Sequence, residues 1–494
     1  MTRARAGPYA LRPLPPLQLH FDHGTLVVPA LPDGIVLPAG LLARDPRTGV
    51  YRAPAHRYRA VVEALLSAKV AVEDHARGFE PLDVRLTTPI EPFPHQAAAL
   101  AAWIAAGCRG IAELPTGSGK TLLAVLAIAH VKRPTLVVVP TLDLLHQWQE
   151  VLSRHLSSPV GLLGGGEKDR QPITVTTYDS AAFQTEFHGN RFGLLVCDEV
   201  HHLPSPGYRF VAEGSIAPFR LGLTATLARA DGGEKLCEEL LGPLCHRVGI
   251  EELSGRYLAP YDVRRVEVAL EADEQLAHDE ARARYLAFVR SERISFADPR
   301  GFARFVALSR RSAEGRAAYE AYREQRRIAL GSHAKVQALW EILLRHRPEP
   351  LLVFTDDNET VHRLARLLLL PALTHHTPIK ERRELLVAFA AGELPALLTS
   401  RVLNEGVDVP DISVGVVLSG SGSVREHVQR LGRLLRRRPG KRAVLYELCS
   451  AGTAEGGISE RRRRHAAYGG QEEERAGVGR GTEAARPPRK DPPC

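Results

Sequence analysis

The sequence predicts an α/β protein with two parallel-sheet domains, a small N-terminal α+β module and a helical insert. From about Pro92, short apolar runs alternate with helical segments, and the same alternation restarts near Leu351. A strand buried on both faces reads as a near-continuous apolar run, so each series indicates a parallel sheet covered by helices. The runs are 135–140, 173–177, 192–198 and 220–226 in the first series, and 351–355, 396–400, 414–418 and 442–446 in the second.

Length and composition exclude several classes of protein. A chain of 494 residues is too long for one hydrophobic core, so about two to four domains are expected. The six cysteines are scattered without C-x-x-C spacing, which argues against zinc, iron–sulfur and disulfide frameworks. A net charge of +8 favours contact with a polyanion. Without a run of membrane-spanning length or a signal-peptide core, the sequence predicts a cytoplasmic protein that binds no membrane.

The N-terminal part is expected to form a small module. Residues 1–16 are rich in proline and arginine and predict a flexible lead-in. In 17–28, apolar and polar residues alternate around a central Asp-His-Gly, which predicts a β-hairpin. Residues 51–69 carry apolar side chains at helical spacing, and 70–73 read as another strand. Residues 17–84 are therefore expected to form an α+β unit.

Residues 271–331 form the predicted helical insert, between a first domain at 85–250 and a second at 332–450. Two interpretations of the insert remain open: a helical hairpin with solvated charges and an aromatic core, or a surface that contacts nucleic acid. Residues 451–494 predict a disordered basic tail. The arginines and aromatic residues that alternate in the insert are Arg282, Arg284, Arg290, Arg304, Arg310 and Arg311, with Tyr285, Phe288, Phe302 and Phe305.

The stretch 114–121 is a candidate phosphate loop between a strand and a helix. Loops of this kind turn backbone N–H groups inward around a phosphate, and the helix adds its positive N-terminal end. Leu114 stands where the generic pattern has glycine, so the strict pattern is not met. We expect Lys120 to reach the outer phosphates of ATP and Thr121 to help hold Mg²⁺. The other loop residues expected to hold the nucleotide are Pro115, Thr116, Gly117, Ser118 and Gly119.

Gln96 precedes the loop strand. It either reads the adenine edge or is a surface residue at the start of a helix. The sequence alone does not choose between these two roles.

The segment Asp198-Glu-Val-His201 ends another buried run. Open α/β sheets place ligand groups at the carboxyl ends of their strands. Asp198 is expected to hold Mg²⁺, and Glu199 is expected to orient and deprotonate the attacking water. His201 follows on the same turn. Thr224 and Thr226 end the next run near the same cleft, and with His201 they are expected to relay the state of the two carboxylates to the other domain.

A basic helix is predicted in the second domain at 429–436. Its spacing of four and three residues places Gln429, Arg433 and Arg436 on one face. Arg433 and Arg436 are candidate arginine fingers, which would reach across the cleft to the γ-phosphate. A generic basic helix is the alternative.

In this order the motifs resemble those of superfamily 2 helicases, and most closely the XPB family in its shorter archaeal and bacterial form. The resemblance extends from about residue 17 to about residue 455. The segments that carry it are LPTGSGKT (114–121), VVPTLDLLHQW (138–148), VTTYDS (175–180), CDEVHHLP (197–204), IAPFRLGLTAT (216–226), VFTDDNE (353–359), LTHHTPIKERRELL (373–386), LNEGVDVPD (403–411) and SGSGSVREHVQRLGRLLR (419–436), with GTLVV (24–28) and GVYRAPAHRYR (49–59).

The resemblance implies two RecA-like domains in an ATP-dependent 3′→5′ DNA helicase or duplex translocase of nucleotide excision repair. It implies that Thr141, Thr177 and Thr399 touch the DNA backbone. The N-terminal module would be a damage-recognition domain, and 271–331 would be a thumb that contacts DNA. The expected partners are single-stranded, forked or distorted duplex DNA and, by analogy with archaeal relatives, a nuclease.

The chain departs from the family pattern in two places. The family's Arg-Glu-Asp element, expected to act on DNA, reads Arg229-Ala230-Asp231, and the arginine before the adenine-reading glutamine is Phe93. Loss of the middle carboxylate keeps open a duplex translocase that unwinds little and remodels repair complexes or feeds a nuclease. A DNA-binding scaffold switched by ATP and an RNA helicase are further alternatives.

Overall fold

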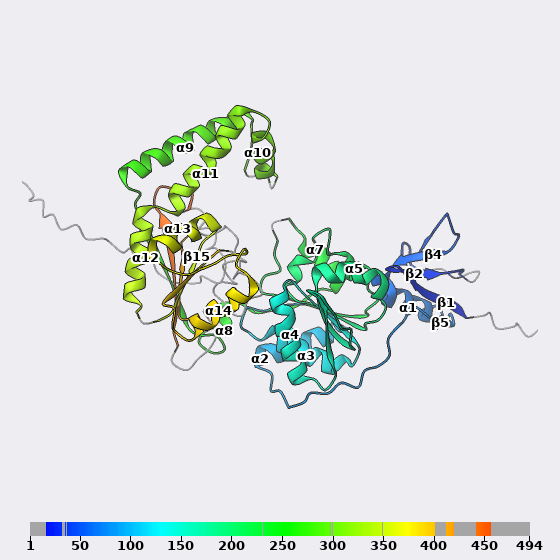
Figure 1. Cartoon of the computed structure of the whole chain (residues 1–494). Helices are drawn as coiled ribbons and strands as arrows, with labels where there is room; N and C mark the ends of the chain where they lie inside the picture. The colour runs from blue at the N-terminus through cyan, green and yellow to red at the C-terminus, as the bar shows by residue number, and fades with distance from the viewer. Residues whose placement is uncertain are drawn as a thin grey trace, which may run out of the picture.

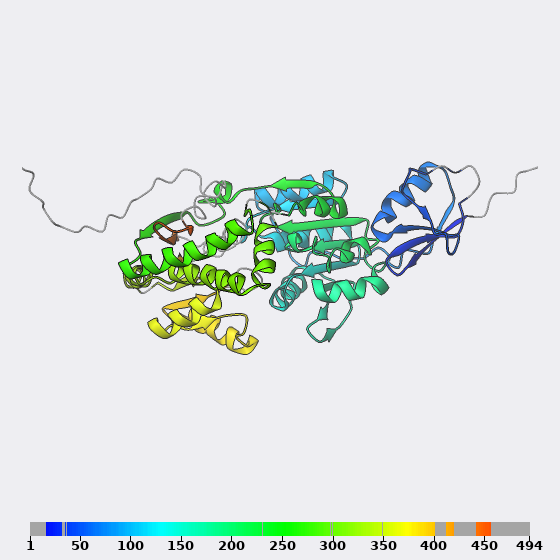
Figure 2. The same cartoon turned by 90° about the horizontal axis from the view of Figure 1, so that it is seen from above.

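Three β-sheets follow one another along the chain. The computed structural model describes residues 16–31, 35, 37–229, 231–296, 298, 300–347, 349–400, 412–418 and 441–455. A small module, a first α/β domain and a second α/β domain lie in a row, and a group of helices projects from the second domain (Figures 1 and 2). The predicted α/β class with two parallel sheets is confirmed. Within the described ranges, no helix has the length and apolar character needed to cross a bilayer.

The N-terminal module contains the predicted hairpin. Two strands pair antiparallel through a turn at His23 and Gly24, whose φ angles of 46° and 79° suit a tight hairpin turn. The sheet has the order β3-β4-β2-β1-β5. Its elements are β1 (Leu17–Asp22), β2 (Thr25–Val28), β3 (Ala43–Arg44), β4 (Tyr51–Pro54), η1 (Ala55–Arg57), α1 (Tyr58–Ser67) and β5 (Val72–Asp74).

The helical spacing expected from residue 51 was wrong for its first part. Strand β4 pairs antiparallel with β2, so its backbone groups are satisfied in the sheet. Pro54 ends the strand, because a proline lacks the N–H that would continue the ladder and holds its predecessor extended. Helix α1 therefore begins only at Tyr58.

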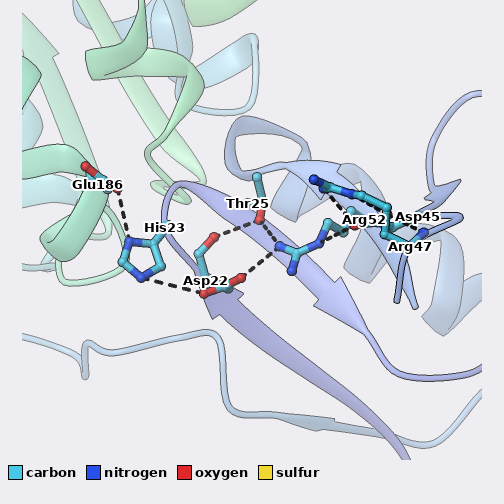
Figure 3. A network of polar contacts seen from close by, with 7 residues as sticks. All are labelled: Asp22, His23, Thr25, Asp45, Arg47, Arg52 and Glu186. Atoms are coloured by element: carbon cyan, nitrogen blue, oxygen red, sulfur yellow. Dashed lines mark hydrogen bonds and ion pairs between the residues drawn. The ribbon is translucent and has the colours of Figure 1, made fainter. Parts of the chain in front are cut away.

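The module is attached to the first α/β domain through its hairpin turn. His23 Nδ1 lies 3.1 Å from Glu186 Oε1 of the first domain (Figure 3). A Cβ on Gly24 would lie 2.6 Å from the Phe210 ring, so only glycine fits at this contact. Behind the turn, Arg52 donates to Asp22 Oδ2 at 2.8 Å and holds the hairpin in shape (Figure 3).

The first α/β domain is built on an eight-stranded sheet with the order β13-β6-β12-β11-β7-β10-β8-β9. All neighbours are parallel except β8 and β9. The four runs read from the sequence are β7, β10, β11 and β12, whereas β8, β9 and β13 were not predicted. The strands are β6 (Arg109–Glu113), β7 (Thr135–Val139), β8 (Val160–Gly164), β9 (Glu167–Lys168), β10 (Ile173–Thr177), β11 (Leu194–Cys197), β12 (Phe219–Thr224) and β13 (Leu244–Arg247).

Helices cover both faces of this sheet, as the continuous apolar strands require. In β7, Val137 and Val139 pack in the core under α2, α3 and α4, and Leu136 and Val138 pack in the core under α5, α6 and α7. The helices are α2 (Pro94–Ala105), α3 (Lys120–Val131), α4 (Leu142–His155), α5 (Tyr178–His188), η2 (Val200–His202), α6 (Phe210–Glu213) and α7 (Glu234–Leu241). The next helix, α8 (Ile250–Leu253), packs in the core of the second domain.

The second α/β domain has a six-stranded parallel sheet with the order β14-β19-β18-β15-β17-β16. Strand β14 precedes the helical insert in the chain, so the insert leaves and returns to this domain. The elements are β14 (Tyr261–Val268), α12 (His333–Arg345), β15 (Leu351–Phe354), α13 (Asn358–Leu368), β16 (Ala372–Leu373), α14 (Ile379–Ala390), β17 (Ala396–Thr399), β18 (Val414–Val417) and β19 (Ala443–Ser450).

The insert is helical, as predicted. It comprises α9 (Ala272–Ser291), α10 (Gly301–Ser309) and α11 (Ala313–Leu330), with α9 and α11 side by side (Figure 1). Phe288 and Phe305 are buried in a small core of its own. The arginines at 282, 284 and 290 are exposed on α9. Phe288 and Phe305 therefore serve folding, whereas Phe302 is 47% exposed and the arginines remain available to a partner.

Residues 451–494 were predicted to be a disordered tail, and this was wrong for 451–455. Residues 451–455 are described, and Glu455 Oε2 lies 2.6 Å from Nζ of Lys335, a lysine that is 0% exposed. Lys335 Nζ also donates to Leu418 O at 2.9 Å. A buried ammonium group needs such partners, so the start of the tail is held against the second domain.

Candidate active site

The phosphate loop lies between β6 and α3, as the sequence predicts. Gly117 and Gly119 have φ angles of 84° and 86°, which L side chains rarely adopt. A Cβ on Gly119 would also lie 2.1 Å from Gln96 Nε2. Ser118 Oγ donates to Pro115 O at 2.7 Å and closes the loop. Helix α3 begins directly at Lys120, so its free N–H groups point into the loop.

Two buried hydroxyl groups at this edge fit a polar ligand. Among the described residues, neither Thr116 Oγ1 nor Thr226 Oγ1 has a hydrogen-bond partner. An unpaired buried hydroxyl costs free energy unless a ligand or water satisfies it. Together with the glycine loop and the Asp198 carboxylate, these groups fit a nucleotide phosphate and a hard cation.

Lys120, Asp198 and Glu199 meet at the carboxyl edge of the sheet. Lys120 Nζ lies 4.0 Å from Glu199 Oε1 and donates to Leu114 O at 3.3 Å. Asp198 Oδ2 accepts from Trp148 Nε1 at 2.9 Å, and Asp198 Oδ1 accepts from Glu199 N at 3.0 Å. The loop motif and the strand end predicted that these three residues serve one nucleotide site, and the fold brings them together.

The backbone at Glu199 is strained. Its φ of 44° is in the left-handed region, which costs a non-glycine residue about 1–3 kcal/mol. Tyr178 Oη donates to Asp198 O at 2.9 Å and helps to hold this turn. The strain turns the carboxylate of Glu199 toward Lys120, next to the phosphate loop.

The carboxyl group of Asp198 titrates abnormally. Burial raises its pKa to about 6, and the neighbouring charge of Glu199 adds to the rise. Lys120 and the hydrogen bond from Trp148 act in the opposite direction. A carboxylate that is costly to ionise in this way gains from a bound cation, which would compensate its charge.

His201, Thr224 and Thr226 form the connection from the acidic pair to the neighbouring strand. His201 Nδ1 lies 3.4 Å from Glu199 Oε2 and 3.2 Å from Thr224 Oγ1. Thr224 Oγ1 donates to Thr226 O at 3.0 Å. Between these two threonines, Ala225 packs in an apolar cluster with the second domain. The three predicted coupling residues are therefore in contact.

Arg229 and Asp231 form an ion pair, with Arg229 Nε donating to Asp231 Oδ1 at 2.8 Å. Arg229 also donates to the backbone carbonyl of His201. This pair therefore touches the turn that carries the acidic residues, a contact that the sequence did not indicate.

Gln96 is at the start of a helix but is buried, so the surface alternative is excluded. Its Nε2 donates to Ser118 O at 2.9 Å, and its Oε1 accepts from Phe93 N at 3.0 Å. In this arrangement the side chain ties the phosphate loop to the start of α2.

The three threonines expected to touch DNA lie at the carboxyl ends of β7, β10 and β17. Thr141 Oγ1 accepts from Leu144 N at 3.3 Å as the N-cap of α4. Thr177 caps α5 in the same way. Thr399 is buried, and its Oγ1 donates to Ser400 O at 3.2 Å. DNA contact by these residues stays a prediction.

Gln429, Arg433 and Arg436 lie outside the described residues. Besides the packing of Ala225, the structure describes an ion pair between the two domains that sequence reasoning missed. Arg382 Nη1 of α14 donates to Asp143 Oδ2 of α4 at 3.1 Å. No local pattern marks these residues, because they meet only when the domains are in place.

Comparisons with known proteins agree with this architecture. Residues 89–229 match the family model of the type III restriction enzyme res subunit, and residues 334–438 match the helicase conserved C-terminal domain. The helicase domain of Pyrococcus furiosus Hef has the same fold, with a TM-score of 0.52 over 74% of this chain and 97% of that one, at 19% identity. Fold and site define a helicase with two motor domains.

The family follows from the N-terminal module and from sequence relatives. Residues 19–76 match the Xeroderma pigmentosum group B helicase damage recognition domain. The chain is 40% identical to the DNA 3′-5′ translocase XPB2 of Sulfurisphaera tokodaii, over 84% of this chain and 93% of the relative. It is 31% identical to the DNA 3′-5′ helicase XPB of Mycobacterium tuberculosis, over 74% of this chain and 62% of the relative. The chain belongs to the XPB family of superfamily 2 helicases, as the motifs indicated.

Proposed function

We propose that the chain uses ATP hydrolysis to move 3′→5′ along DNA and to separate its strands during repair of the nucleotide-excision type. The observation that carries this proposal is the meeting of Lys120, Asp198 and Glu199 at one edge of the first sheet. Such an edge is where open α/β sheets bind ligands. The names of the relatives, a DNA translocase and a DNA helicase, support the choice of DNA as the track.

ATP would bind with its phosphates in the loop of Gly117 and Gly119. Thr121 and Asp198 would hold Mg²⁺, which when bound neutralises charge on the outer phosphates. Lys120 would leave Glu199 for the γ-phosphate, and the freed carboxylate would accept a proton from the attacking water. Positioning and charge compensation by these residues account for most of the catalysis in this type of reaction.

The second domain would complete the site. Gln429, Arg433 and Arg436 are proposed to face the γ-phosphate across the cleft, on the support of their spacing and of the helicase model matched by 334–438. A finger arginine contributes roughly 10³–10⁵ in rate. The contacts of His201 and Thr224 beside Glu199 support a path from hydrolysis to domain movement, because Ala225 packs against the second domain.

DNA would lie over the carboxyl ends of both sheets. Thr141, Thr177 and Thr399 are proposed to contact its backbone, and Arg229 and Asp231 to act where strands part. The insert is proposed to contact DNA phosphates through the arginines of α9. The exposure of these arginines supports the nucleic-acid interpretation of the insert.

The experiment that tests the proposal is ATP turnover with and without forked DNA, beside displacement of a labelled strand from that fork. Stimulated turnover with strand displacement supports a helicase. Turnover that DNA does not stimulate contradicts the proposal.

A second candidate is a duplex translocase that unwinds little and remodels repair complexes or feeds a partner nuclease. It is favoured by the name of the 40% identical relative, a translocase, and by alanine at position 230 of the Arg-x-Asp element. Displacement of a triplex-forming strand without separation of a fork supports the translocase over the helicase.

A further inference from the structure

The helical insert joins the second domain through two short crossings. Strand β14 ends at Val268 shortly before α9, and α11 ends at Leu330 shortly before α12. The crossings contact each other, because His333 N donates to Glu274 Oε1 at 3.0 Å. This contact alone would let α9 and α11 turn together about the crossings. The direction of the insert therefore depends on contacts with the ends of the strands below it.

The segment that follows the last strand, β19, supplies such contacts. Ala451 N donates to Val268 O at 2.8 Å, at the crossing into the insert. Ser450 Oγ donates to Ala329 O at 2.7 Å, in the last turn of α11. Figure 1 shows the end of the described chain, in orange, at the foot of the insert. Residues 450–455, here called the clamp, thus contact the chain both before and after the insert.

A buried ion pair fixes the clamp to the second sheet. Lys335 of α12 is 0% exposed, and its Nζ lies 2.6 Å from Glu455 Oε2 and donates to Leu418 O at 2.9 Å. Glu455 Oε2 also accepts from Ser450 N at 2.9 Å. Leu418 directly follows β18, so this pair joins α12 to the ends of β18 and β19. A buried ammonium group is costly without such partners, so loss of Glu455 should loosen the whole junction.

A further contact reaches the next strand of the sheet. Arg326 of α11 donates to Asp356 Oδ2 at 2.9 Å, just after the end of β15. Strands β19, β18 and β15 are neighbours in the sheet and parallel, so their carboxyl ends lie at one edge. The insert is therefore held at three adjacent strand ends, and the clamp supplies the contacts at two of them.

We propose that residues 450–455 hold the insert in a fixed direction on the second domain, and that Glu455 is a positioning residue for movement along DNA. The inference rests on the proposed ATP-driven movement and on the proposed contact of the insert with DNA. Under that mechanism, a movement of the second domain displaces DNA only as far as the insert follows the domain. A loosened clamp should leave ATP turnover intact and reduce the movement produced by each ATP.

The first test measures the direction of the insert itself. Energy transfer between dyes on α10 and α13 reports the distance from the insert to the body of the second domain, with no need of ATP or DNA. The distance distribution should broaden in Glu455→Gln. Glu341→Gln is the matched control, because Glu341 is exposed on α12 of the same domain. An unchanged distribution in Glu455→Gln would overturn the inference.

The second test measures coupling as the number of ATP molecules hydrolysed per strand displaced from a fork or from a triplex. Glu455→Gln should raise this number about three- to tenfold, since substitutions within a contact network change coupling by that order. Its ATP turnover at saturating DNA should equal that of the wild type. An equal fall of turnover and displacement would overturn the inference, because the residue would then support the ATP site or the fold as a whole.

Loss of stability must be separated from loss of coupling. Glu455→Gln leaves a buried ammonium group without its carboxylate, so its melting temperature should fall. Adding Lys335→Met removes the second charge and should restore the melting temperature, because an apolar residue is tolerated where a buried ion pair stood. The ATP used per displaced strand should stay high in the double variant. Recovery of coupling together with stability would overturn the inference.

Two truncations separate the clamp from the basic residues that follow it. A chain that ends at residue 460 keeps Glu455 and should couple like the wild type, whereas a chain that ends at residue 452 should behave like Glu455→Gln. Equal coupling in the two truncated chains would contradict the clamp. Absence of DNA-stimulated turnover in the wild type would contradict the proposed function, and the dye distances would still decide whether the clamp holds the insert.

Discussion

Lys120 and Glu199 hold each other at the phosphate site, with Nζ and Oε1 4.0 Å apart and both side chains about nine-tenths buried. The lysine comes from the first turn of α3, and the glutamate comes from the strained turn after β11. In this arrangement the ammonium group of Lys120 lies beside Glu199, the carboxylate that would activate water. In the proposed mechanism, the nucleotide phosphates separate this pair before Glu199 acts on water.

Lys120→Ala and Glu199→Gln are each expected to lower DNA-stimulated ATP turnover by about 10²-fold or more. The first removes the charge proposed to face the outer phosphates, and the second removes the proposed general base. Steady-state turnover at saturating forked DNA checks this prediction, with Lys168→Ala and Glu150→Gln as exposed controls. Near wild-type turnover in either site variant would show that the site is assigned wrongly. Repair that survives in cells with a turnover-dead variant would favour the ATP-switched scaffold.

Asp198→Asn is expected to stabilise the fold while it abolishes hydrolysis. Burial raises the pKa of Asp198 to about 6, above its ordinary value of 3.8, so the folded chain binds the proton more readily than the unfolded chain. Ionised Asp198 therefore costs stability above pH 6, and that cost disappears as pH falls from about 6 to about 4. Asparagine removes the charge and keeps one acceptor oxygen, so its NH2 group faces either Trp148 Nε1 or Glu199 N, which offsets part of the gain.

Thermal unfolding checks this prediction. At pH 7.5 and without nucleotide or metal, the Asn variant should melt roughly 2–4 °C higher than the wild type, and the difference should shrink toward pH 5. A lower melting temperature at pH 7.5 would mean that the ionised carboxylate stabilises the fold, contrary to the direction of its pKa shift.

The exposed arginines of the insert should contribute phosphate contacts. Replacing Arg282, Arg284 and Arg290 by alanine is expected to weaken DNA binding and to reduce the salt slope of log K by about one per lost phosphate contact. Fluorescence anisotropy with forked DNA over a range of salt concentrations measures both quantities. A matched triple variant removes three exposed arginines of the second domain, Arg345, Arg366 and Arg383. An equal effect of the two triple variants would show that the arginines of the insert contribute only through the overall positive charge of the protein.

The pair of Arg382 and Asp143 should hold the two domains in the arrangement described here. Its atoms lie 3.1 Å apart, and the side chains are 16% and 32% exposed, so water screens the pair only in part. Arg382→Ala is expected to shift the populations of domain arrangements by about fivefold, which corresponds to about 1 kcal/mol. Energy transfer between dyes on α4 and α13 reports the shift. Arg383→Ala, its exposed neighbour, is the control, and an unchanged distance distribution in Arg382→Ala would contradict the prediction.

The strands that carry the site could be predicted because they are buried on both faces. The segment Thr-Leu-Val-Val-Val at 135–139 is buried at every position and shows no alternation of polar and apolar residues. The neighbouring strands have similar apolar sequences. Strand β14 was missed because it is an edge strand: Tyr261–Val268 is only half-buried and contains two adjacent arginines. Residues 51–54 were read as helix from their local spacing. Their conformation is instead decided by pairing with β2, which local spacing does not reveal.

The candidate site was predictable where chemistry fixes local spacing, and hidden where it depends on partners far along the chain. Lys120 could be predicted from the pattern of the phosphate loop, and Asp198 could be predicted from its position at the end of a buried strand. The hydrogen bonds of Gln96 to the loop, the burial of Lys335 against Glu455 and the contact of Arg229 with His201 require the folded chain. None of these contacts has a signal in the neighbouring residues.

The most direct test of the account is ATP turnover by the full chain with single-stranded DNA, duplex DNA, forked DNA and RNA compared side by side. If the site at Lys120 and Glu199 is coupled to DNA, DNA should raise the rate of ATP turnover well above the basal rate. RNA should leave that rate close to the basal rate. Turnover that no nucleic acid raises, or that RNA raises more than DNA, would contradict the DNA motor.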